Sequence, residues 1–493
     1  MKENSKTDFL SFLHFCFFVI GFSLFFIGNI TIHFNIILCG LLFFYLSLLF
    51  YCFKRFKRRC ILTFLYIMIW VFLLSRPTVN MFKGVIWWYY TNEEMLFGLN
   101  SIFVALVFIH LGNIVCEAIL EKNGHYKNEK TPLFFPEKLG DENLNKTLRF
   151  ISGAGFIVAF IFTTVVGIEK MLFVRNHSYE DIYANFSSSL PYVFSIFADF
   201  LPFFLCVFLG TLPKKSSAFV FLVFYTASKV PMFILGTRAD IVLAAVFALV
   251  YFIIRDYLDG TKYWLGKFEK TAIVIACPFV LALLGAYNYI RAGTNVVDGG
   301  FFAIIIDFFY KQGVTFDISC RAYSAIPLLP GNSPKFYIFG GFIDYFTHGS
   351  IAQILFGATD LGPGNSVFKA TEGHSFAHGL AYVMEPDYLA GKGCGSSFIM
   401  ESYADFGYIG IAVFSFFLAF VICYMIPLFK RNRLLRIIIL TALTSLFIVP
   451  RAEAIGWLTF VINIKFWLVI VFCYLFANIL AVENKHKRGF KNV

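Results

Sequence analysis

The sequence predicts an all-α membrane protein that crosses the bilayer about twelve times and carries one large external loop. Hydrophobic residues make up 59% of the 493-residue chain and charged residues only 14%, whereas a soluble domain has about 45–50% and about 25%. The hydrophobic residues form blocks long enough to cross a hydrocarbon core about 30 Å thick. Lysine and arginine gather in the short stretches between these blocks. This distribution excludes a water-soluble globular protein.

Twelve blocks are predicted to be membrane-spanning helices. They cover about 9–27, 31–53, 61–75, 95–119, 149–168, 190–212, 217–235, 239–254, 271–289, 398–428, 434–449 and 454–482. The first block lacks a small-residue cleavage site, so it is interpreted as a retained helix and not as a signal peptide. The chain is expected to divide into an N-terminal bundle of about nine helices (1–290), an external loop subdomain (291–397) and about three C-terminal helices (398–493).

The distribution of basic residues predicts the orientation. Six basic segments fall on one side of the twelve spans: KRFKRR (54–59), loop 120–147, Lys214 with Lys215, 255–270, KRNRLLR (430–436) and the tail KHKRGFK. The positive-inside rule makes this side, and both termini, cytoplasmic. These loops explain the net charge of +11, so no nucleic-acid partner is expected. A crossing at Phe336–Gly357 would put the last two segments outside, so this stretch is expected to be interfacial or re-entrant.

The external loop runs from Ile290 to about Ser396 and is rich in Phe, Tyr, Ile and Gly. Loops this long are usually functional or disordered, and this composition does not favour disorder, so we expect it to fold against the membrane. Cys320 and Cys394 both lie in it, where a disulfide is chemically possible. The chain has no C-x-x-C and no Cys/His metal spacing.

Arginines on the external side are the first candidates for substrate binding. Six are expected outside or at the outer lip of the membrane: Arg76, Arg175, Arg238, Arg291, Arg321 and Arg451. A guanidinium binds phosphate through two parallel hydrogen bonds, so this group suits a lipid-linked phosphate or pyrophosphate. Contact with lipid headgroups is the alternative. In GTRAD (236–240), Thr237 and Asp240 are also predicted to cap the following helix.

Two acids lie at the start of the tenth span, in GKGCGSSFIMESYADFGYIG (391–410). Glu401 and Asp405 are four residues apart, which places both on one helical face, where like charges repel. Ser396 or Ser397 is predicted to cap this helix. In one interpretation both acids hold external arginines and brace the loop. In the other, Glu401 deprotonates an acceptor hydroxyl and Asp405 supports it.

Other polar residues suggest contacts within the membrane or the loop. His374 and His378 in HSFAH are one helical turn apart, but no glutamate or third ligand accompanies them, so no metal site is predicted and a sugar or phosphate contact is expected. Asp199 and Lys229 fall at matching depths on consecutive spans and are predicted to pair. No nucleotide-binding motif is present, so no nucleotide cofactor is expected.

The sequence resembles the Wzy-type O-antigen and oligosaccharide repeat-unit polymerases. The resemblance rests on segment 391–410, on FFYKQGVTFDIS (308–319), on GTRAD and on the hydropathy layout with one large external loop. It implies a GT-C-like glycosyltransferase of the bacterial cytoplasmic (inner) membrane that needs no cofactor. The donor and acceptor would be undecaprenyl-pyrophosphate-linked oligosaccharides, joined into O-antigen or capsule, with a chain-length regulator as a further partner.

The resemblance also implies roles for the candidate residues. Arginines would stabilise the departing pyrophosphate, with Arg238, Arg291, Arg321 and Arg451 as the candidates. Glu401, Asp405, His374 and His378 are the candidates for proton transfer. A polysaccharide ligase would use the same groups. A lipid-linked oligosaccharide transporter or flippase would instead need charges at mid-membrane and broken helices in corresponding halves, of which the sequence offers only Asp199 and Lys229.

Overall fold

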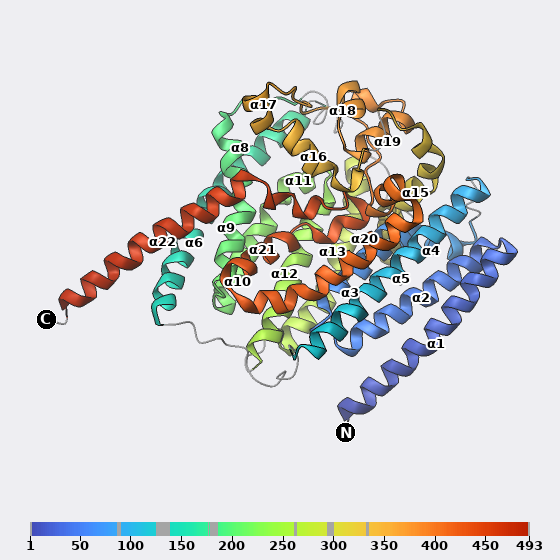
Figure 1. Cartoon of the computed structure of the whole chain (residues 1–493), viewed down its shortest axis with the longest axis horizontal. Coiled ribbons are helices and arrows are strands. Elements are labelled where there is room, and N and C mark those ends of the chain that lie inside the picture. The colour runs from blue at the N-terminus through green and yellow to red at the C-terminus, as the bar shows by residue number, and fades with distance from the viewer. Residues whose placement is uncertain are drawn as a thin grey trace.

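The computed structural model describes residues 2–85, 90–124, 139–175, 177, 186–260, 264–292, 300–331 and 335–491, and these contain helices and no strand. Twelve helical stretches in the described residues are long and apolar enough to cross a membrane. The prediction of an all-α polytopic membrane protein is therefore confirmed. Figure 1 shows these helices as a tilted bundle, with short helices of the segment before the tenth span gathered over one end.

The spanning stretches follow the predicted order. They consist of α1 (Lys2–Thr31), α2 (Phe34–Lys54), α3 (Cys60–Ile69) with the π-helix η1 (Trp70–Leu74) and α4 (Ser75–Lys83), α5 (Asn92–Lys122), α6 (Leu139–Val174), α8 (Tyr192–Asp199) with α9 (Leu201–Gly210), α10 (Lys215–Ala227) with α11 (Val230–Leu235), α12 (Arg238–Asp259), α13 (Lys267–Ala292), α20 (Phe398–Arg431), α21 (Arg433–Leu443) with the 3-10 helix η5 (Leu446–Arg451), and α22 (Ile464–Lys491).

The last span begins later than the sequence predicts. The predicted start was residue 454, whereas α22 begins at Ile464 and is preceded by the 3-10 helix η6 (Gly456–Val461). Asn463 Oδ1 accepts the backbone N–H of Lys465 at 2.9 Å and so stabilises the new helix start. Residues 452–463 are as apolar as a span, but they form a turn at the end of the bundle.

This later start changes a predicted ion pair. Asp199 Oδ2 lies 2.6 Å from Lys465 Nζ in the first turn of α22, and no ion pair joins Asp199 to Lys229 among the described contacts. The Lys229 ammonium instead lies 4.9 Å from the centre of the Tyr225 ring. The predicted ion pair is therefore not formed, although the charge of Asp199 still acts on Lys229; residue depth along two helices does not say which other helix faces them.

A second local prediction was also wrong. Thr237 does precede α12, which begins at Arg238, but its hydroxyl does not cap that helix. Thr237 Oγ1 donates to the carbonyl of Met232 at 2.8 Å, at the end of α11. The hydroxyl stabilises the preceding turn, since a threonine between two helices can serve either one.

The cap is formed by the segment between α13 and α20. It contains α14 (Gly300–Gln312), α15 (Val314–Ala325), η2 (Ile326–Leu328), η3 (Tyr337–Phe339), α16 (Gly340–Thr347), α17 (Ser350–Phe356), α18 (Val367–Glu372), α19 (Phe376–Met384) and η4 (Tyr388–Ala390). Residues 336–357 form three of these short helices, and none of them is long enough to cross a membrane. Figure 1 shows α16 to α19 over one end of the bundle, with the N-terminus at the other.

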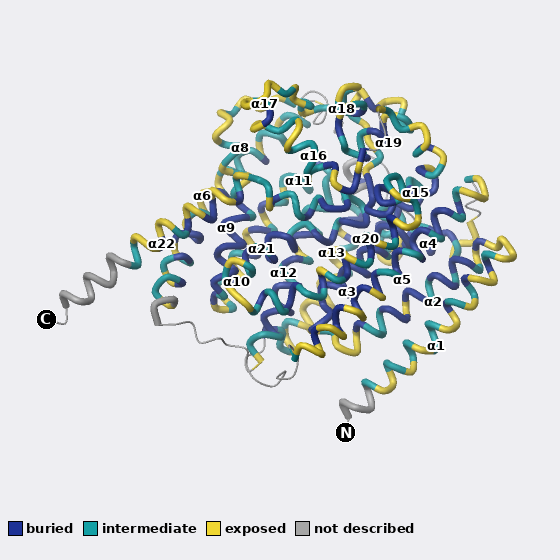
Figure 2. The backbone as a smooth tube through the Cα atoms, in the orientation of Figure 1, coloured by how far each residue is buried: buried dark blue, intermediate teal, exposed yellow. Residues whose placement is uncertain are grey.

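Helices α5 and α20 pack tightly at the centre of the bundle. A Cβ on Gly112 would collide with the backbone oxygen of Phe416, so glycine permits this approach. Buried residues concentrate in the central helices, as the dark segments of α3, α5 and α20 in Figure 2 show. The middle of α20 is thereby held against α5.

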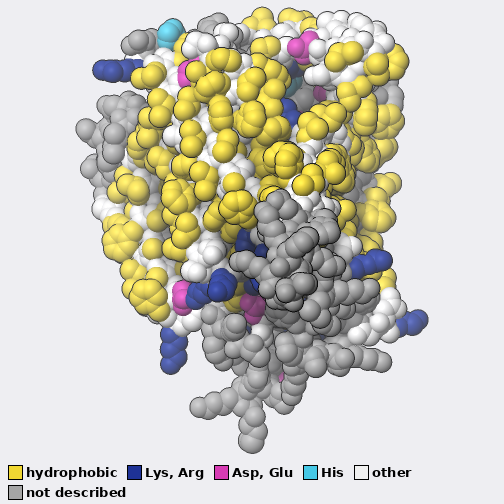
Figure 3. Space-filling model, turned by 90° about the vertical axis from the view of Figure 1, so that its left-hand side faces the viewer, with side chains coloured by type: hydrophobic (Ala, Val, Ile, Leu, Met, Phe, Trp, Pro, Cys, Tyr) yellow, Lys and Arg dark blue, Asp and Glu magenta, His cyan; other side chains and the backbone are white. Residues whose placement is uncertain are grey.

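Charged side chains gather at the end opposite the cap. Counting the spans places residues 54–59, 214–215 and 430–433 there, because each follows an even-numbered span. Buried ion pairs occur at this end, including Arg59 to Glu117 at 2.6 Å and Arg255 to Asp259 at 3.2 Å. Figure 3 shows one face of the molecule with a hydrophobic belt and with lysine and arginine mostly below it. The belt is the surface that a lipid bilayer would cover.

Candidate active site

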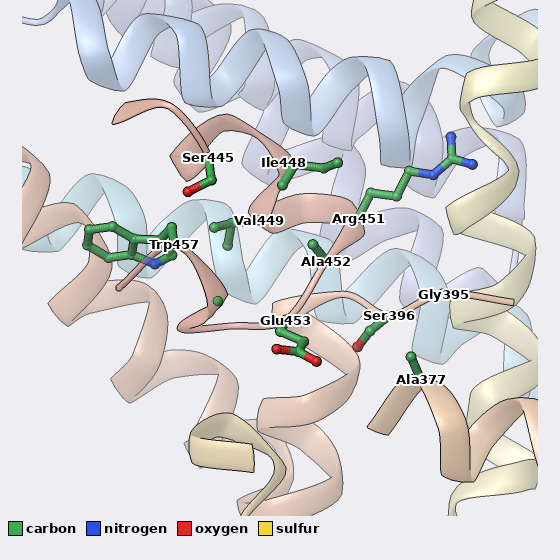
Figure 4. Close-up of a pocket in the computed structure, with 11 residues that line it drawn as sticks. Ala377, Gly395, Ser396, Ser445, Ile448, Val449, Arg451, Ala452, Glu453 and Trp457 are labelled. Atoms are coloured by element: carbon green, nitrogen blue, oxygen red, sulfur yellow. The ribbon is translucent and has the colours of Figure 1, made fainter. Parts of the chain in front are cut away.

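A cavity of about 410 Å³ lies where the cap meets the bundle (Figure 4). Most of its wall comes from residues 445–457, with Gly395 and Ser396 before α20 and Ala377 of α19 completing it. Arg451 and Glu453 are the charged residues among the eleven that line it. The cavity is therefore built from all three parts of the chain that meet at this end: the cap, the start of α20 and the turn before α22.

The turn between α21 and α22 is irregular for local reasons. Pro450 has no backbone N–H to donate, and Ala452 is extended with φ −145°, so the helix cannot continue. Trp457 Nε1 donates to the Ala454 carbonyl at 3.0 Å and closes the turn. This geometry lets two neighbouring charged residues point in different directions: in Figure 4 the Arg451 guanidinium lies away from the Glu453 carboxylate.

Glu453 is a largely buried carboxylate on the cavity wall. Ser375, the residue before α19, lies near it. Burial raises the pKa of Glu453, and the negative charge of Asp344 raises it further, whereas the Ser375 hydroxyl opposes both effects. A carboxyl group in these surroundings exchanges a proton closer to neutral pH than an exposed glutamate does.

Asp344 and His374 form a pair next to Glu453. Asp344 Oδ1 lies 2.9 Å from His374 Nδ1, and the same carboxylate accepts the His374 backbone N–H at 2.9 and 3.1 Å. Because a carboxylate only accepts, Nδ1 of His374 donates this hydrogen bond. His374 is adjacent in the chain to Ser375, whose hydroxyl acts on the Glu453 carboxyl.

His378 is directed elsewhere. Its Nδ1 lies 3.0 Å from the Tyr388 hydroxyl, which in turn donates to the Ser366 carbonyl at 3.2 Å. Burial lowers the pKa of His378 to about 4, so the ring is neutral at physiological pH. The two histidines do not converge on one point, because His374 precedes α19 while His378 lies within it.

Glu401 is fully buried beneath the cavity, and both of its oxygens are in use. Oε1 accepts from the Ser396 hydroxyl at 2.6 Å, and Oε2 accepts from the backbone N–H of Ala454 at 2.8 Å. The carboxylate thus joins the segment before α20 to the turn that carries Glu453. This geometry favours the bracing alternative for Glu401, although its partners are not the arginines that the sequence suggested.

Asp405 also organises backbone. Its Oδ1 and Oδ2 accept the N–H groups of Tyr337 and Ile338, each at 2.8 Å, at the start of η3. The first turns of α20 are separated from the rest at Phe406 and Gly407, where Gly407 has φ +61° and ψ −151°, a combination that only glycine adopts readily. Glu401 and Asp405 therefore sit on a short helical segment of their own, which Ser397 caps as predicted.

We expect Asp405→Ala to loosen the cap. Two backbone N–H groups would lose a charged acceptor, and each such bond contributes about 1.5–3 kcal/mol. Limited proteolysis of the purified protein should therefore cut within residues 335–397 faster than in the unmodified chain. Asp387→Ala, at an exposed position of the same cap, serves as the control. An unchanged rate of cleavage for Asp405→Ala would contradict this bracing role.

Three of the external arginines gather around α15. Arg76 pairs with Asp317 of α15 and stacks over the Tyr310 ring at 4.5 Å. Arg451 Nη1 lies 3.0 Å from the Gln312 side-chain oxygen, and Arg321 is exposed on α15 itself. The motif 308–319 is thus the place where these arginines meet. Asp317 is half-buried, and burial raises the pKa of its carboxyl against the lowering effect of Arg76.

The other predicted arginines lie on different elements. Arg238 is the first residue of α12, and Arg175 is exposed after the end of α6. Arg291 lies in the last turn of α13, and its side chain is outside the described residues. The sequence predicted a set of six arginines; of these, Arg76 and Arg321 lie at α15, and Arg451 lies at the adjoining end of α14.

A sequence model of the family described as "O-antigen polysaccharide polymerase Wzy" matches residues 13–484, nearly the whole chain. The chain belongs to this family. No curated protein and no solved structure matches it. Membership supports a multi-pass membrane protein that builds O-antigen polysaccharide, in agreement with the twelve spans.

In this Wzy family member, sequence reasoning overlooked Glu453 and Asp344. Glu453 follows Arg451 in PRAEA, and its place beside a predicted external arginine was the available signal. Asp344 lies in the apolar stretch 336–357, where an isolated acid indicates a functional or paired group. Neither signal could reveal that the charge of Asp344 acts on Glu453, from a segment more than one hundred residues away.

No metal site is found in the described part of this Wzy family member, where no three His, Cys, Asp or Glu side chains come together. Cys320 and Cys394 are both free thiols. Cys320 packs in the large core of the bundle, whereas Cys394 packs with the smaller clusters of the cap. The disulfide considered from the sequence is not formed.

Proposed function

We propose that this Wzy family member joins undecaprenyl-pyrophosphate-linked oligosaccharide repeat units into O-antigen at the external face of the bacterial inner membrane. The cavity is the observation that carries the proposal. It lies at the capped end of the spans, it has the Glu453 carboxyl group on its wall, and Arg451 on that wall is bonded to Gln312, next to α15. Glycosyl transfer from a lipid pyrophosphate requires these elements together.

The proposed reaction is a single displacement. A hydroxyl of the acceptor oligosaccharide attacks the anomeric carbon of the donor, and the bond from that carbon to the pyrophosphate oxygen breaks. The electron pair leaves with the undecaprenyl pyrophosphate, whose charge the arginines stabilise. Arg321 and Arg451 are the proposed pyrophosphate ligands, and Arg238 and Arg291 remain candidates for contacts farther along the substrate. No cofactor takes part in this scheme.

The proposed acid–base residues fall into two groups. His374 is held by Asp344 next to Ser375 and is proposed to contact the substrate, with Asp344 as its positioning partner. Glu401, Asp405 and His378 act by positioning. Glu401 is bonded to Ser396 and Ala454, Asp405 to the start of η3, and His378 through Nδ1 to Tyr388.

A chain-length regulator is a further proposed partner, as is the lipid that surrounds the belt.

A deletion strain tests the proposal. Its surface polysaccharide should carry single repeat units, and the unmodified gene should restore the ladder of longer chains. Absence of any surface repeat would indicate an export function, as in a flippase. Accumulation of lipid-linked polymer that reaches no final acceptor would indicate a ligase. A capsule phenotype in place of an O-antigen phenotype would leave the reaction but change the product.

We also expect the cap to be external and both termini to be cytoplasmic. The basic segments at the opposite end favour this orientation. In a chain without other reactive thiols, an impermeant thiol reagent added to intact cells should label Asp387→Cys in the cap and not Arg431→Cys at the other end. Both positions are exposed, whereas Gly331, with φ +90°, would be strained by a side chain. The reverse labelling pattern would overturn the orientation.

A further inference from the structure

Glu453 is the one carboxylate among the eleven residues that line the cavity. The turn that carries it is fixed from both sides: Glu401 accepts the N–H of Ala454, and Trp457 donates to the carbonyl of the same residue. A carboxylate that must meet a substrate hydroxyl needs such a fixed backbone, because misplacement by about 1 Å is costly to a reaction.

Two glycines make room for the Glu453 carboxylate. A Cβ on Gly341, the second residue of α16, would lie 3.2 Å from Glu453 Oε2, and a Cβ on Gly456 would lie 3.3 Å from Glu453 Cβ and 3.6 Å from Oε2. The first distance is tighter than an ordinary contact, so a side chain at position 341 would push the carboxylate. The carboxylate therefore lies close to the backbone of Gly341 and to that of Gly456, which also lines the cavity.

The charges facing Glu453 are negative or directed away. The negative charge of Asp344 on α16 acts on Glu453, and the charge of Glu453 acts on Glu401 of α20. His374 is held by Asp344, Ser375 supplies a neutral hydroxyl, and the Arg451 guanidinium points away. No lysine or arginine forms an ion pair with Glu453 among the described contacts. The structural carboxylate of Glu401 has both oxygens on protein donors, whereas the Glu453 side chain lies on the cavity wall.

We propose, on the basis of the polymerase function above, that Glu453 is the catalytic base that accepts the proton of the acceptor hydroxyl. As that oxygen forms its bond to the anomeric carbon of the donor, its O–H bond breaks and the proton goes to the Glu453 carboxylate. The carbon–oxygen bond to the pyrophosphate breaks, and its electron pair leaves with the lipid pyrophosphate. Ser375 and Asp344 are positioning residues, since they hold and tune the carboxylate without touching the substrate.

Purified protein in lipid nanodiscs, supplied with lipid-linked repeat units, tests this role. We expect Glu453→Gln to lower kcat by about 100-fold or more, the usual contribution of a general base, with KM changed much less. Glu453→Ala should be equally slow but should recover activity with added formate, which can occupy the vacated space and accept the proton. Glu372→Gln, at an exposed glutamate of the cap, should behave like the unmodified protein.

The pH profile separates a base from a structural support. Activity should fall as pH drops through the pKa of Glu453, because only the ionised carboxylate accepts a proton. Asp344→Asn removes a charge that raises this pKa. The fall of activity on the acidic side of the profile, the acid limb, should therefore occur at lower pH. A support role would leave the limb in place and would show no rescue by formate.

The possible outcomes separate the two proposals. If the unmodified protein makes no polymer from these substrates, the polymerase function and the role of Glu453 both fall. If it does make polymer, but Glu453→Gln is as fast, or Glu453→Ala is not rescued and the acid limb does not move, the role of Glu453 alone is overturned. Glu453→Asp keeps the charge and provides a folded comparison should the neutral variants be present in low amount.

Discussion

Replacing Glu401 with alanine should abolish polymer formation and lower the amount of folded protein, whereas Glu401→Gln should keep most of both. Alanine would leave the Ser396 hydroxyl and the Ala454 N–H buried without their acceptor. Each unsatisfied group costs about 1–3 kcal/mol, and the lost side chain adds a cavity. A total of about 3–6 kcal/mol is a large fraction of the stability of an ordinary protein.

Glutamine can preserve both contacts at position 401. Its carbonyl oxygen can accept from Ala454, and its amide can donate to the Ser396 hydroxyl after that hydroxyl rotates. Chain length of the surface polysaccharide and thermal unfolding in detergent would be measured together, with the exposed Glu93→Ala as control. If Glu401→Gln is present in normal amount and yet makes no polymer, an ionised Glu401 is required and the bracing interpretation is wrong.

Lysine in place of Arg321 or Arg451 should lower kcat/KM by about 10- to 100-fold while the protein remains folded. Lysine keeps the charge but cannot supply two parallel hydrogen bonds to a phosphate, and a hydrogen bond to a charged group contributes about 1.5–3 kcal/mol. Arg451→Lys should show the larger loss, because Arg451 lines the cavity and is also bonded to Gln312.

Arg175→Lys is the matched control for this pair, since Arg175 is exposed on the same side of the bundle but lies after α6. Rates with lipid-linked repeat units would be compared at equal amounts of protein. If all three lysine variants match the unmodified protein, the arginines around α15 bind headgroups of ordinary lipids and not the pyrophosphate of the substrate.

The position of the candidate site depended on contacts that no local pattern contains. Asp405 was predicted to face arginines or to assist a base, yet it accepts two backbone N–H groups of η3. Asp199 was assigned to the neighbouring helix, yet its partner is on α22. In both cases the sequence identified a polar group that needed a partner and could not say which distant segment would supply it.

The sequence by itself determined the twelve spans, their order and the helix start at Ser397, because the length of a hydrophobic block and the preference for a capping hydroxyl are local properties. Only the tertiary structure decided that Glu401 joins Ser396 to Ala454, that residues 452–463 turn instead of entering the last span, and that Glu453 and Asp344 meet beside the cavity. The physical reason is burial. A carboxyl group inside the protein needs hydrogen-bond donors, and these come from the segments that pack against it.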